Sequence, residues 1–455
     1  MSCSFSETNP DHRRFFSYNA QIIGYMNPLF SELYKDAGFG STIKTRLSNS
    51  YLIGEIFGML FFGFLIDRIG RRTGIVFATL FLVLGVIIAT AAHGTTPLGM
   101  FWMMIIGRGI AGFGAGGEYP TCTTGSSEAA DENEHVRRKR GILVAMATDF
   151  SIDLGFVVAG VVALIVLAAY DERTSDGVWR VCFGLGFVLP VNPNDREHAI
   201  PQARHETEHP VHARSQAILE TDAGNESRLV HVGTYRKPLA DPNDLADDFV
   251  TYPFGIFSSS IISSLNPNDT LVQNIGYGTV VNLFYLPGCV VGGFLMDWIG
   301  RKQTMTLGFI CWSIMGFIIG GALGPIQSIT PLFLILYGIF NAFGEMGPGV
   351  ATFLCGAESF PTPLRGHFLG LAAAFGKAGA AIGTQVFTPI QNSVFLIGAA
   401  FAATGGLIAW FLIPDRERDL ESEDARFRAY LEANGYSGLF GESLEKDLKT
   451  TNFKV

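Results

Sequence analysis

Charged side chains are scarce in this chain. They make up 16% of its 455 residues, whereas a soluble domain carries roughly 25%. Hydrophobic residues reach 48%, with 38 Phe and 54 Gly, and the mean hydropathy is +0.30. This composition argues against an ordinary soluble domain and predicts a protein that crosses a membrane several times.

Cysteine is rare too: six are scattered through the chain, most of them in or beside apolar runs. They are expected to pack as small residues rather than to form disulfides or bind a metal. The four histidines between His198 and His212 follow no metal-ligand spacing either. Because no nucleophile and base stand in a recognisable pattern, we predict no metal, no cofactor and no enzymatic activity.

Long apolar runs dominate what is present. A run of about 20 residues can cross the bilayer as a helix, and nine runs reach that length, with shorter or more polar candidates at 14–31, 179–191 and 249–264. The chain is therefore predicted to be an all-α membrane protein with twelve spans. The longer runs lie near 49–66, 73–93, 98–125, 141–170, 276–296, 303–324, 330–355, 366–390 and 394–413.

A basic motif occurs twice in this pattern. Residues 63–73 read Gly-Phe-Leu-Ile-Asp-Arg-Ile-Gly-Arg-Arg-Thr, and residues 293–303 read Gly-Phe-Leu-Met-Asp-Trp-Ile-Gly-Arg-Lys-Gln. Both copies directly follow an apolar run, which indicates an internal duplication. Each resembles the loop between the second and third helices of one half of a major facilitator superfamily transporter. The resemblance implies two six-helix halves with the substrate between them near the midplane.

Basic residues fall on alternate loops, with the loop that contains Lys35, Lys44 and Arg46 as the exception. This pattern sets the expected orientation. The loops at 68–72, 137–140 and 301–302 are rich in Lys and Arg, whereas the loop at 265–270 has none. By the positive-inside rule the basic loops and both termini should be cytoplasmic, in a multi-pass protein of the plasma membrane. Asn268, in the sequon Asn-Asp-Thr, is then extracellular and a candidate glycosylation site.

Charged residues of these loops are candidates for a cytoplasmic gate. We expect Asp67 to pair with Arg140, and Asp297 with Arg365, when the cytoplasmic end is closed. The alternative is that these residues only anchor the helix ends at the membrane interface. The predicted gate consists of Asp67, Arg71, Arg140, Asp297, Arg301 and Arg365.

The fourth apolar run carries Arg108, followed by glycines at 112, 114 and 116. These glycines are not a dinucleotide loop, because no strand precedes them. Small residues at this density favour close packing of membrane helices. Arg108 is different, since an arginine in an apolar span is costly unless it faces a partner or a wet cavity. It is a candidate substrate ligand.

More specific segments narrow the resemblance. Gly116-Gly-Glu-Tyr-Pro120 is similar to the fourth-span signature of phosphate:proton symporters. Further segments resemble the fungal glycerophosphoinositol and glycerophosphodiester permeases of that branch, and the likeness covers most of 17–190 and 248–440. These segments are 248–255, 344–348, 358–366 and 376–379.

Lys377 stands in the middle of an Ala- and Gly-rich run. An unpaired ammonium there would cost several kcal/mol, so an anionic substrate is its expected partner, and family members use a lysine at this position to hold phosphate. The alternative is a structural lysine that is paired with an acid such as Glu118 or Glu345. The resemblance assigns Lys377, Tyr252, Tyr119 and Arg108 to the substrate, and Glu118 and Asp248 to proton coupling.

Residues 192–247 do not fit this plan, because the sixth run turns hydrophilic and stays so until Phe249. We interpret the segment as the product of a reading-frame slip, since shifted codons permit a family-like Lys-Arg-Tyr-Trp-Lys-Pro loop. The first, sixth and seventh spans are expected to be incomplete. The predicted organisation is a cytoplasmic tail at 1–13, an N-terminal half at 14–191, a central loop at 192–247, a C-terminal half at 248–414 and a cytoplasmic tail at 415–455.

These inferences predict a proton-coupled importer of a phosphorylated solute, with glycerophosphoinositol or another glycerophosphodiester as the first candidate. Inorganic phosphate comes second. A sugar comes third, because a lysine in the substrate site argues against a neutral ligand. A non-transporting sensor or a defective gene product is the alternative from another class. The expected partners are a small phosphorylated anion, protons and the lipid bilayer, with no nucleic acid, and the chain is expected to act as a monomer.

Overall fold

The computed structural model describes residues 10–35, 38–69, 71–129, 139–188, 242–265, 269–359, 365–387 and 393–413, with two single positions at 425 and 429. Within these ranges the regular elements are all helices. The all-α prediction is therefore confirmed.

Helices of the N-terminal half fill the first six positions, and the fifth is a pair interrupted at Thr148. They are α1 (Pro10–Leu33), α2 (Ser41–Ile69), α3 (Arg71–Thr90), α4 (Pro97–Ala129), the pair α6 (Arg140–Ala147) and α7 (Asp149–Ala169), and α8 (Asp176–Val188).

The C-terminal half repeats this plan, with three of its positions interrupted. It consists of α12 (Pro242–Ile256) with α13 (Ser258–Leu265), α14 (Leu271–Leu283) with α15 (Tyr285–Ile299), α16 (Arg301–Gly321), the short α17 (Leu323–Gln327), α18 (Thr330–Gly344) with the π-helical turn η3 (Glu345–Gly349) and α19 (Val350–Ser359), α20 (Arg365–Phe387) and α21 (Val394–Leu412).

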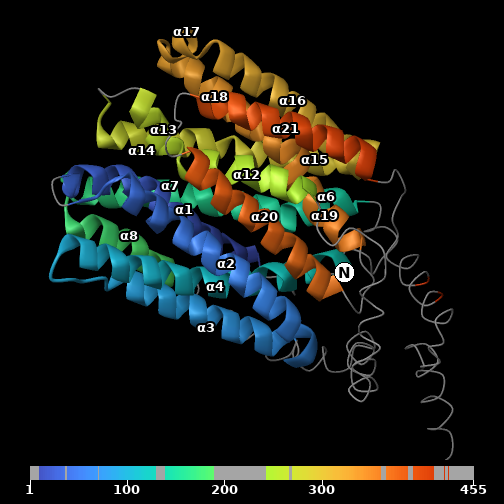
Figure 1. Cartoon of the computed structure of the whole chain (residues 1–455), viewed down its shortest axis with the longest axis horizontal. Helices are drawn as coiled ribbons and strands as arrows, with labels where there is room; N and C mark the ends of the chain where they lie inside the picture. Colours follow the sequence, from blue (N-terminus) through green and yellow to red (C-terminus); the bar gives the residue numbers. More distant parts are fainter. Residues whose placement is uncertain are drawn as a thin grey trace, which may run out of the picture.

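The two halves lie side by side, one drawn from blue to green and the other from yellow to red (Figure 1). Helix α2 packs along α20, and the pair α6–α7 packs along α14–α15. The interface between the halves therefore runs along the length of these helices, and the residues of the candidate site come from both of its sides.

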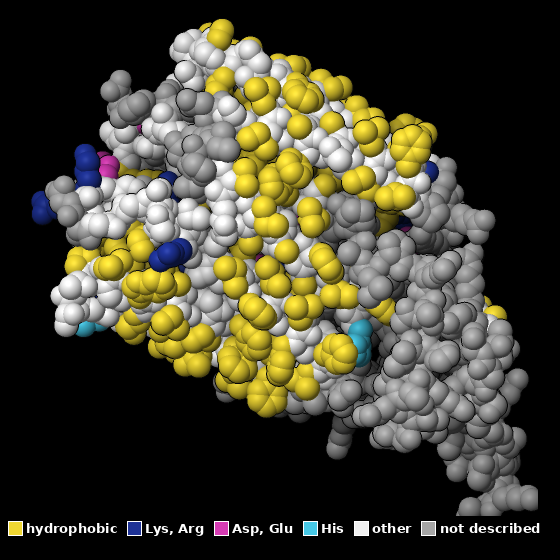
Figure 2. Space-filling view, viewed as in Figure 1, with side chains coloured by type: hydrophobic (Ala, Val, Ile, Leu, Met, Phe, Trp, Pro, Cys, Tyr) yellow, Lys and Arg dark blue, Asp and Glu magenta, His cyan; other side chains and the backbone are white. Residues whose placement is uncertain are grey.

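The outer surface is apolar, as a lipid-facing surface must be. Six of the described helices or continuous helix pairs are long and apolar enough to cross a membrane. Apolar side chains cover most of the central part of the face in Figure 2. Large aromatic side chains among them, such as Phe57, Phe64 and Phe294, are more than half exposed. An aqueous protein would not leave so much apolar surface uncovered.

Glycines set the close approach of α2 to α4. A Cβ atom at Gly112 would collide with the backbone carbonyl of Tyr51, and one at Gly116 would collide with that of Glu55. The predicted packing role of the fourth-span glycines is therefore confirmed. Gly300 serves a different purpose, because it makes the tight turn between α15 and α16. Its φ is 91°, a backbone angle that residues with a side chain rarely adopt.

The helix bounds bear on the spans that were expected to be incomplete, and their incompleteness stays a prediction. Helix α1 has 24 residues, which is long enough at about 1.5 Å per residue for a core about 30 Å thick, but it is not among the described helices that are also apolar enough to cross. Helix α12 starts at Pro242, not at residue 248, because a proline is tolerated in the first helical turn. The sixth helix, α8, has 13 residues. Residues 189–241 lie outside the described part of the chain, so the frame slip stays a prediction.

Candidate functional site

A buried ion pair lies at the centre of the candidate site. Lys377 of α20 places its Nζ 2.9 Å from Oδ2 of Asp248 on α12. Lys377 is 1% exposed, so its ammonium has exchanged water for this carboxylate. This pairing is of the structural kind that the alternative describes, although the acid is Asp248 and neither Glu118 nor Glu345.

Two aromatic rings complete the surroundings of this ammonium. Its Nζ lies 3.9 Å from the ring centroid of Tyr252 and 5.0 Å from that of Tyr119. Tyr252 follows Asp248 by one turn of α12, whereas Tyr119 comes from α4 in the other half. A cation over aromatic faces is stabilised electrostatically. Lys377 thus lies beside three other predicted site residues: Asp248, Tyr252 and Tyr119.

Glu118 forms a hydrogen bond with Thr79. It is buried, and its Oε1 accepts a hydrogen bond of 2.8 Å from the hydroxyl of Thr79 on α3. The carboxyl group therefore faces a neighbouring helix of its own half. Its predicted role in proton coupling stays a prediction.

Arg108 ties helices together. Its Nε donates to the carbonyl of Leu47 at 3.0 Å, and its two Nη atoms donate to the carbonyls of Asn19 and Ala20 at 3.0 and 3.4 Å. These carbonyls belong to α2 and α1, so the guanidinium holds three helices of the N-terminal half. These hydrogen bonds favour a structural role for Arg108, and its predicted contact with substrate stays a prediction.

Glu55 of α2 is a carboxyl group to which no role was assigned from the sequence. It is 1% exposed and interacts electrostatically with Lys377, Asp248 and Arg108. Its Oε2 has no hydrogen-bond partner in the part of the chain that the structure describes. A carboxylate in an apolar span was the available signal, and the structure adds its proximity to the ion pair.

Three further carboxyl groups gather close by, across the two halves. Asp153 of α7, Asp247 of α12 and Glu345 of η3 are buried and interact electrostatically with one another. Buried like charges at this spacing repel unless protons neutralise part of them. Asp247 was missed because the hydrophilic stretch up to residue 247 was assigned to one loop.

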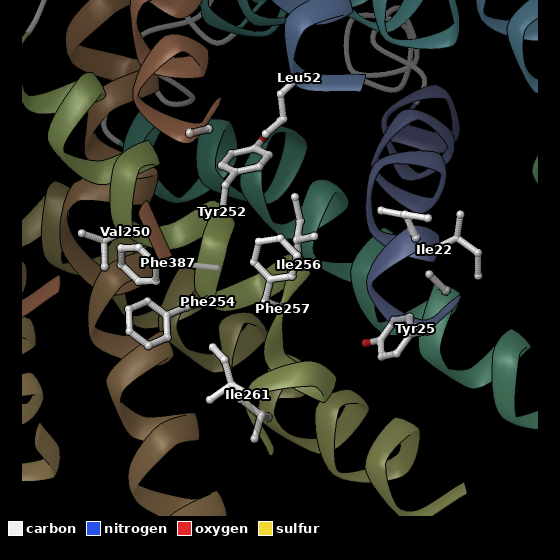
Figure 3. Close-up of a cluster of buried hydrophobic side chains, with 14 of the residues drawn as sticks. Ile22, Tyr25, Leu52, Val250, Tyr252, Phe254, Ile256, Phe257, Ile261 and Phe387 are labelled. Atoms are coloured by element: carbon white, nitrogen blue, oxygen red, sulfur yellow. The ribbon is translucent and has the colours of Figure 1, made fainter. Parts of the chain in front are cut away.

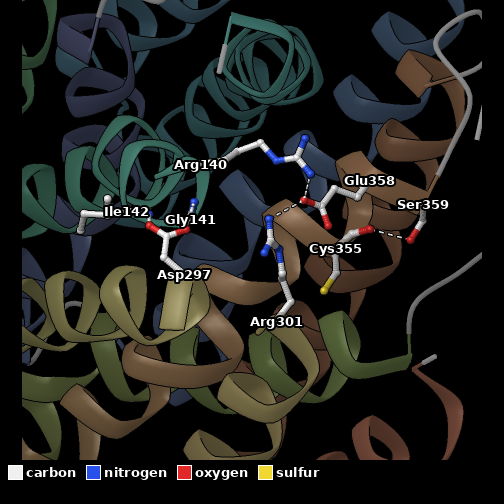
Figure 4. A network of polar contacts seen from close by, with 8 residues as sticks. All are labelled: Arg140, Gly141, Ile142, Asp297, Arg301, Cys355, Glu358 and Ser359. Atoms are coloured by element: carbon white, nitrogen blue, oxygen red, sulfur yellow. Dashed lines mark hydrogen bonds and ion pairs between the residues drawn. The ribbon is translucent and has the colours of Figure 1, made fainter. Parts of the chain in front are cut away.

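The end of the molecule that carries Arg140 and Arg301 is held by a shared carboxylate. Glu358 of α19 pairs with Arg140 of α6 in the other half, and its Oε1 also accepts from Nη2 of Arg301 at 3.0 Å (Figure 4). We call this arrangement the Glu358 clamp. It includes two of the predicted gate residues and joins the halves at the end we call the basic end.

Asp297 strengthens the same end in another way. Its Oδ1 accepts from the backbone N–H of Gly141 at 2.7 Å, and its Oδ2 from that of Ile142 at 3.1 Å (Figure 4). It therefore caps the first turn of α6, where free N–H groups and the helix dipole favour an anion. The side chains of Asp67, Arg71 and Arg365, and all of Asn268, lie outside the described residues. The expected pairs Asp67–Arg140 and Asp297–Arg365 stay predictions.

The halves also touch at the opposite end. Asn49 of α2 donates from Nδ2 to the carbonyl of Ala381 on α20 at 3.0 Å, and its Oδ1 accepts from the Thr384 hydroxyl. The two halves are therefore in contact at both ends, and Lys377 is buried between these ends.

Comparison with known proteins assigns the chain to a family. The family model described as "Sugar (and other) transporter" matches residues 14–192 and 252–423. The chain belongs to this transporter family of the major facilitator superfamily. The predicted membership is confirmed.

Relatives and a solved structure agree with the assignment. The transporter is 35% identical to "Glycerophosphoinositol permease 1" of Candida albicans, over 93% of this chain and 81% of the relative. It is 34% identical to "Glycerophosphoinositol transporter 1" of Saccharomyces cerevisiae, over 91% and 80%. The proton:xylose symporter XylE superposes with a TM-score of 0.72 at 17% identity, over 93% of this chain and 98% of that one, and shows that the fold is shared.

Proposed function

We propose that this transporter imports a glycerophosphodiester together with protons, and that glycerophosphoinositol is its first candidate substrate. The buried ammonium of Lys377 carries the proposal, because it is a fixed cation at the interface of the two halves. The relatives named as glycerophosphoinositol transporters support the choice of substrate.

The ion pair gives a mechanism for substrate exchange. A phosphodiester carries one negative charge, so it can take the place of Asp248 beside Lys377 without leaving the ammonium unpaired. Asp248 must then be neutralised, since an uncompensated buried carboxylate is costly. A proton does this, and binding of the anion is thereby linked to uptake of a proton. The hydroxyl of Tyr252 can donate a hydrogen bond to the phosphate.

Alternating access follows from the two contacts between the halves. Opening of the basic end would separate Glu358 from Arg140, and opening of the other end would separate Asn49 from Ala381. We propose that these contacts break in turn while the substrate stays between the halves. The same proposal includes three further points. The protein lies in the plasma membrane with its basic end in the cytoplasm, and one chain acts as a monomer.

Inorganic phosphate is the second candidate, because the same ammonium and tyrosine would bind it. The preference between the two substrates is tested by uptake of labelled glycerophosphoinositol into cells that lack their own carrier, with unlabelled phosphate as competitor. Lys377→Ala should abolish uptake per molecule at the cell surface, whereas Lys35→Ala, at an exposed lysine just beyond the end of α1, should not. Undiminished uptake by Lys377→Ala would overturn the proposal.

A further inference from the structure

A second buried polar cluster, without charge, lies close to the ion pair. It consists of amide and hydroxyl side chains from three helices, all of them buried. We call it the neutral cluster, and its members are Gln21 and Tyr25 of α1, Ser258 and Ser259 of α13, and Thr279 and Asn282 of α14.

Direct contacts hold this cluster together across the two halves. Asn282 donates from Nδ2 to the Tyr25 hydroxyl at 3.0 Å. The Tyr25 hydroxyl and Thr279 Oγ1 both lie against Gly160 of α7, where an added Cβ would collide with both. Ser259 lies against Gly278 in the same manner. The side chains therefore share one small region.

Several atoms of the neutral cluster have no partner. Within the described part of the chain, the amide oxygens of Gln21 and Asn282 and the hydroxyls of Ser258 and Ser259 make no hydrogen bond. Buried polar atoms are nearly always bonded, so four exceptions in one region indicate a bound molecule with several polar groups. A hydroxyl group suits all four, because it donates to an amide oxygen and accepts from a serine hydroxyl.

Helix α12 connects this region to Lys377. Tyr252, whose ring lies under the ammonium, precedes Gly255 by three residues, or about 4.5 Å of helix. A Cβ at Gly255 would lie 3.3 Å from the Tyr285 hydroxyl and 3.9 Å from Gln21 Oε1, so the backbone at Gly255 faces the neutral cluster. Figure 3 shows Tyr25 of α1 and Tyr252 of α12, which belong to the two halves. The ion pair and the neutral cluster therefore lie next to each other along α12.

We infer that the neutral cluster binds the polyhydroxylated part of the substrate, an inositol ring or a glycerol unit, while the phosphate lies at Lys377. This inference rests on the proposed function and adds to it the group that is recognised beside the phosphate. A phosphodiester without hydroxyl groups would leave the four atoms unpaired and bind more weakly.

Two ligands that share the phosphodiester test this inference: glycerophosphoinositol and dimethyl phosphate, which has no hydroxyl. Dissociation constants are measured by calorimetry on the purified full chain in detergent. Asn282→Leu should weaken glycerophosphoinositol about tenfold, the loss expected for one to two hydrogen bonds, and change dimethyl phosphate less than about twofold. The matched control is Asn274→Leu, at a buried amide two turns away on α14 that contacts Asp269 instead.

The melting temperature of each variant shows whether it folds. If Asn282→Leu does not fold, the two ligands are compared on Tyr25→Phe and Ser259→Ala, each of which removes a single hydroxyl. Loss of affinity for both ligands alike, or for neither, in the folded variants would mean that the cluster is structural packing and would overturn the inference. A wild-type chain that binds neither ligand, or whose dimethyl phosphate affinity survives Lys377→Ala, would overturn the proposed function itself.

Discussion

Lys377 and Asp248 pair within one half of the transporter, with Nζ 2.9 Å from Oδ2, although they are 129 residues apart in the chain. The pair fixes α20 against α12 and does not by itself bind the halves together. Tyr119 of the other half touches the same ammonium through its ring. An anion that replaces Asp248 at this point would therefore be in contact with both halves.

This relationship predicts a pattern in stability. Lys377→Met leaves Asp248 buried without its cation and should lower the free energy of unfolding by about 3–5 kcal/mol. The double variant Lys377→Met, Asp248→Asn removes both charges and should recover most of that loss. Thermal unfolding in detergent measures both. A double variant as unstable as the single one would show that the charge of Asp248 is not the cause.

Proton coupling predicts a dependence on external pH. Uptake should be faster at acidic external pH and should stop when a protonophore collapses the gradient, because protons then no longer drive substrate inward. Glu118→Gln should flatten the pH profile more than it weakens binding. Glu32→Gln, at an exposed position near the end of α1, is the control. Uptake that ignores both pH and the protonophore would indicate facilitated diffusion or exchange.

The Glu358 clamp predicts a change in access at the basic end. Glu358→Gln removes the charge that Arg140 and Arg301 share, so this end should open more often. Cys355, buried one turn before Glu358 on α19, should then react several-fold faster with a maleimide. Cys182 on α8 is a buried reference thiol in the same molecule. Equal acceleration at both thiols would mean general loosening and would speak against a local clamp.

Close packing of α2 against α4 predicts intolerance to one methyl group. Gly112→Ala forces the Cβ against the Tyr51 carbonyl, and overpacking of this kind costs about 1–3 kcal/mol. Gly276→Ala on α14 is the matched control, since nothing lies within 4 Å of its Cβ position. The melting temperature should fall for the first variant and hold or rise for the second. Equal melting temperatures would contradict the packing argument.

Much of the architecture could be predicted from the sequence, because apolar run length and the repeated basic motif are strong signals in a membrane protein. Lys377 was predicted as a site residue because a charge in an apolar span is costly, whereas Asp248 and Tyr252 were assigned from the family resemblance. Their mutual pairing was not predicted, because it depends on how α12 and α20 pack. The contact of Glu358 with Arg140 was not predicted either, because it exists only once the two halves meet.

The neutral cluster could not be found from the sequence at all. Serine, threonine and asparagine occur widely in apolar helices, where they bond to the carbonyl one turn earlier, as Thr279 does with Ile275. Only the structure shows that Gln21, Asn282 and Ser259 keep unpaired atoms in one region. The start of α12 was misplaced for a related reason, because Asp247 looks like a loop residue until its burial is known.

The last prediction concerns the sixth span. Helix α8 has 13 residues, or about 20 Å at 1.5 Å per residue, which is short of the roughly 30 Å of a bilayer core. The frame-slip hypothesis predicts that the transcript across codons 190–250 restores an apolar continuation and a loop with Lys-Arg-Tyr-Trp-Lys-Pro. A frame-corrected chain should then reach the cell surface and take up glycerophosphoinositol faster than the chain as written, because an even number of complete spans keeps both basic loops on one side of the membrane. A transcript that matches the present sequence, with a stable and transporting product, would refute the slip.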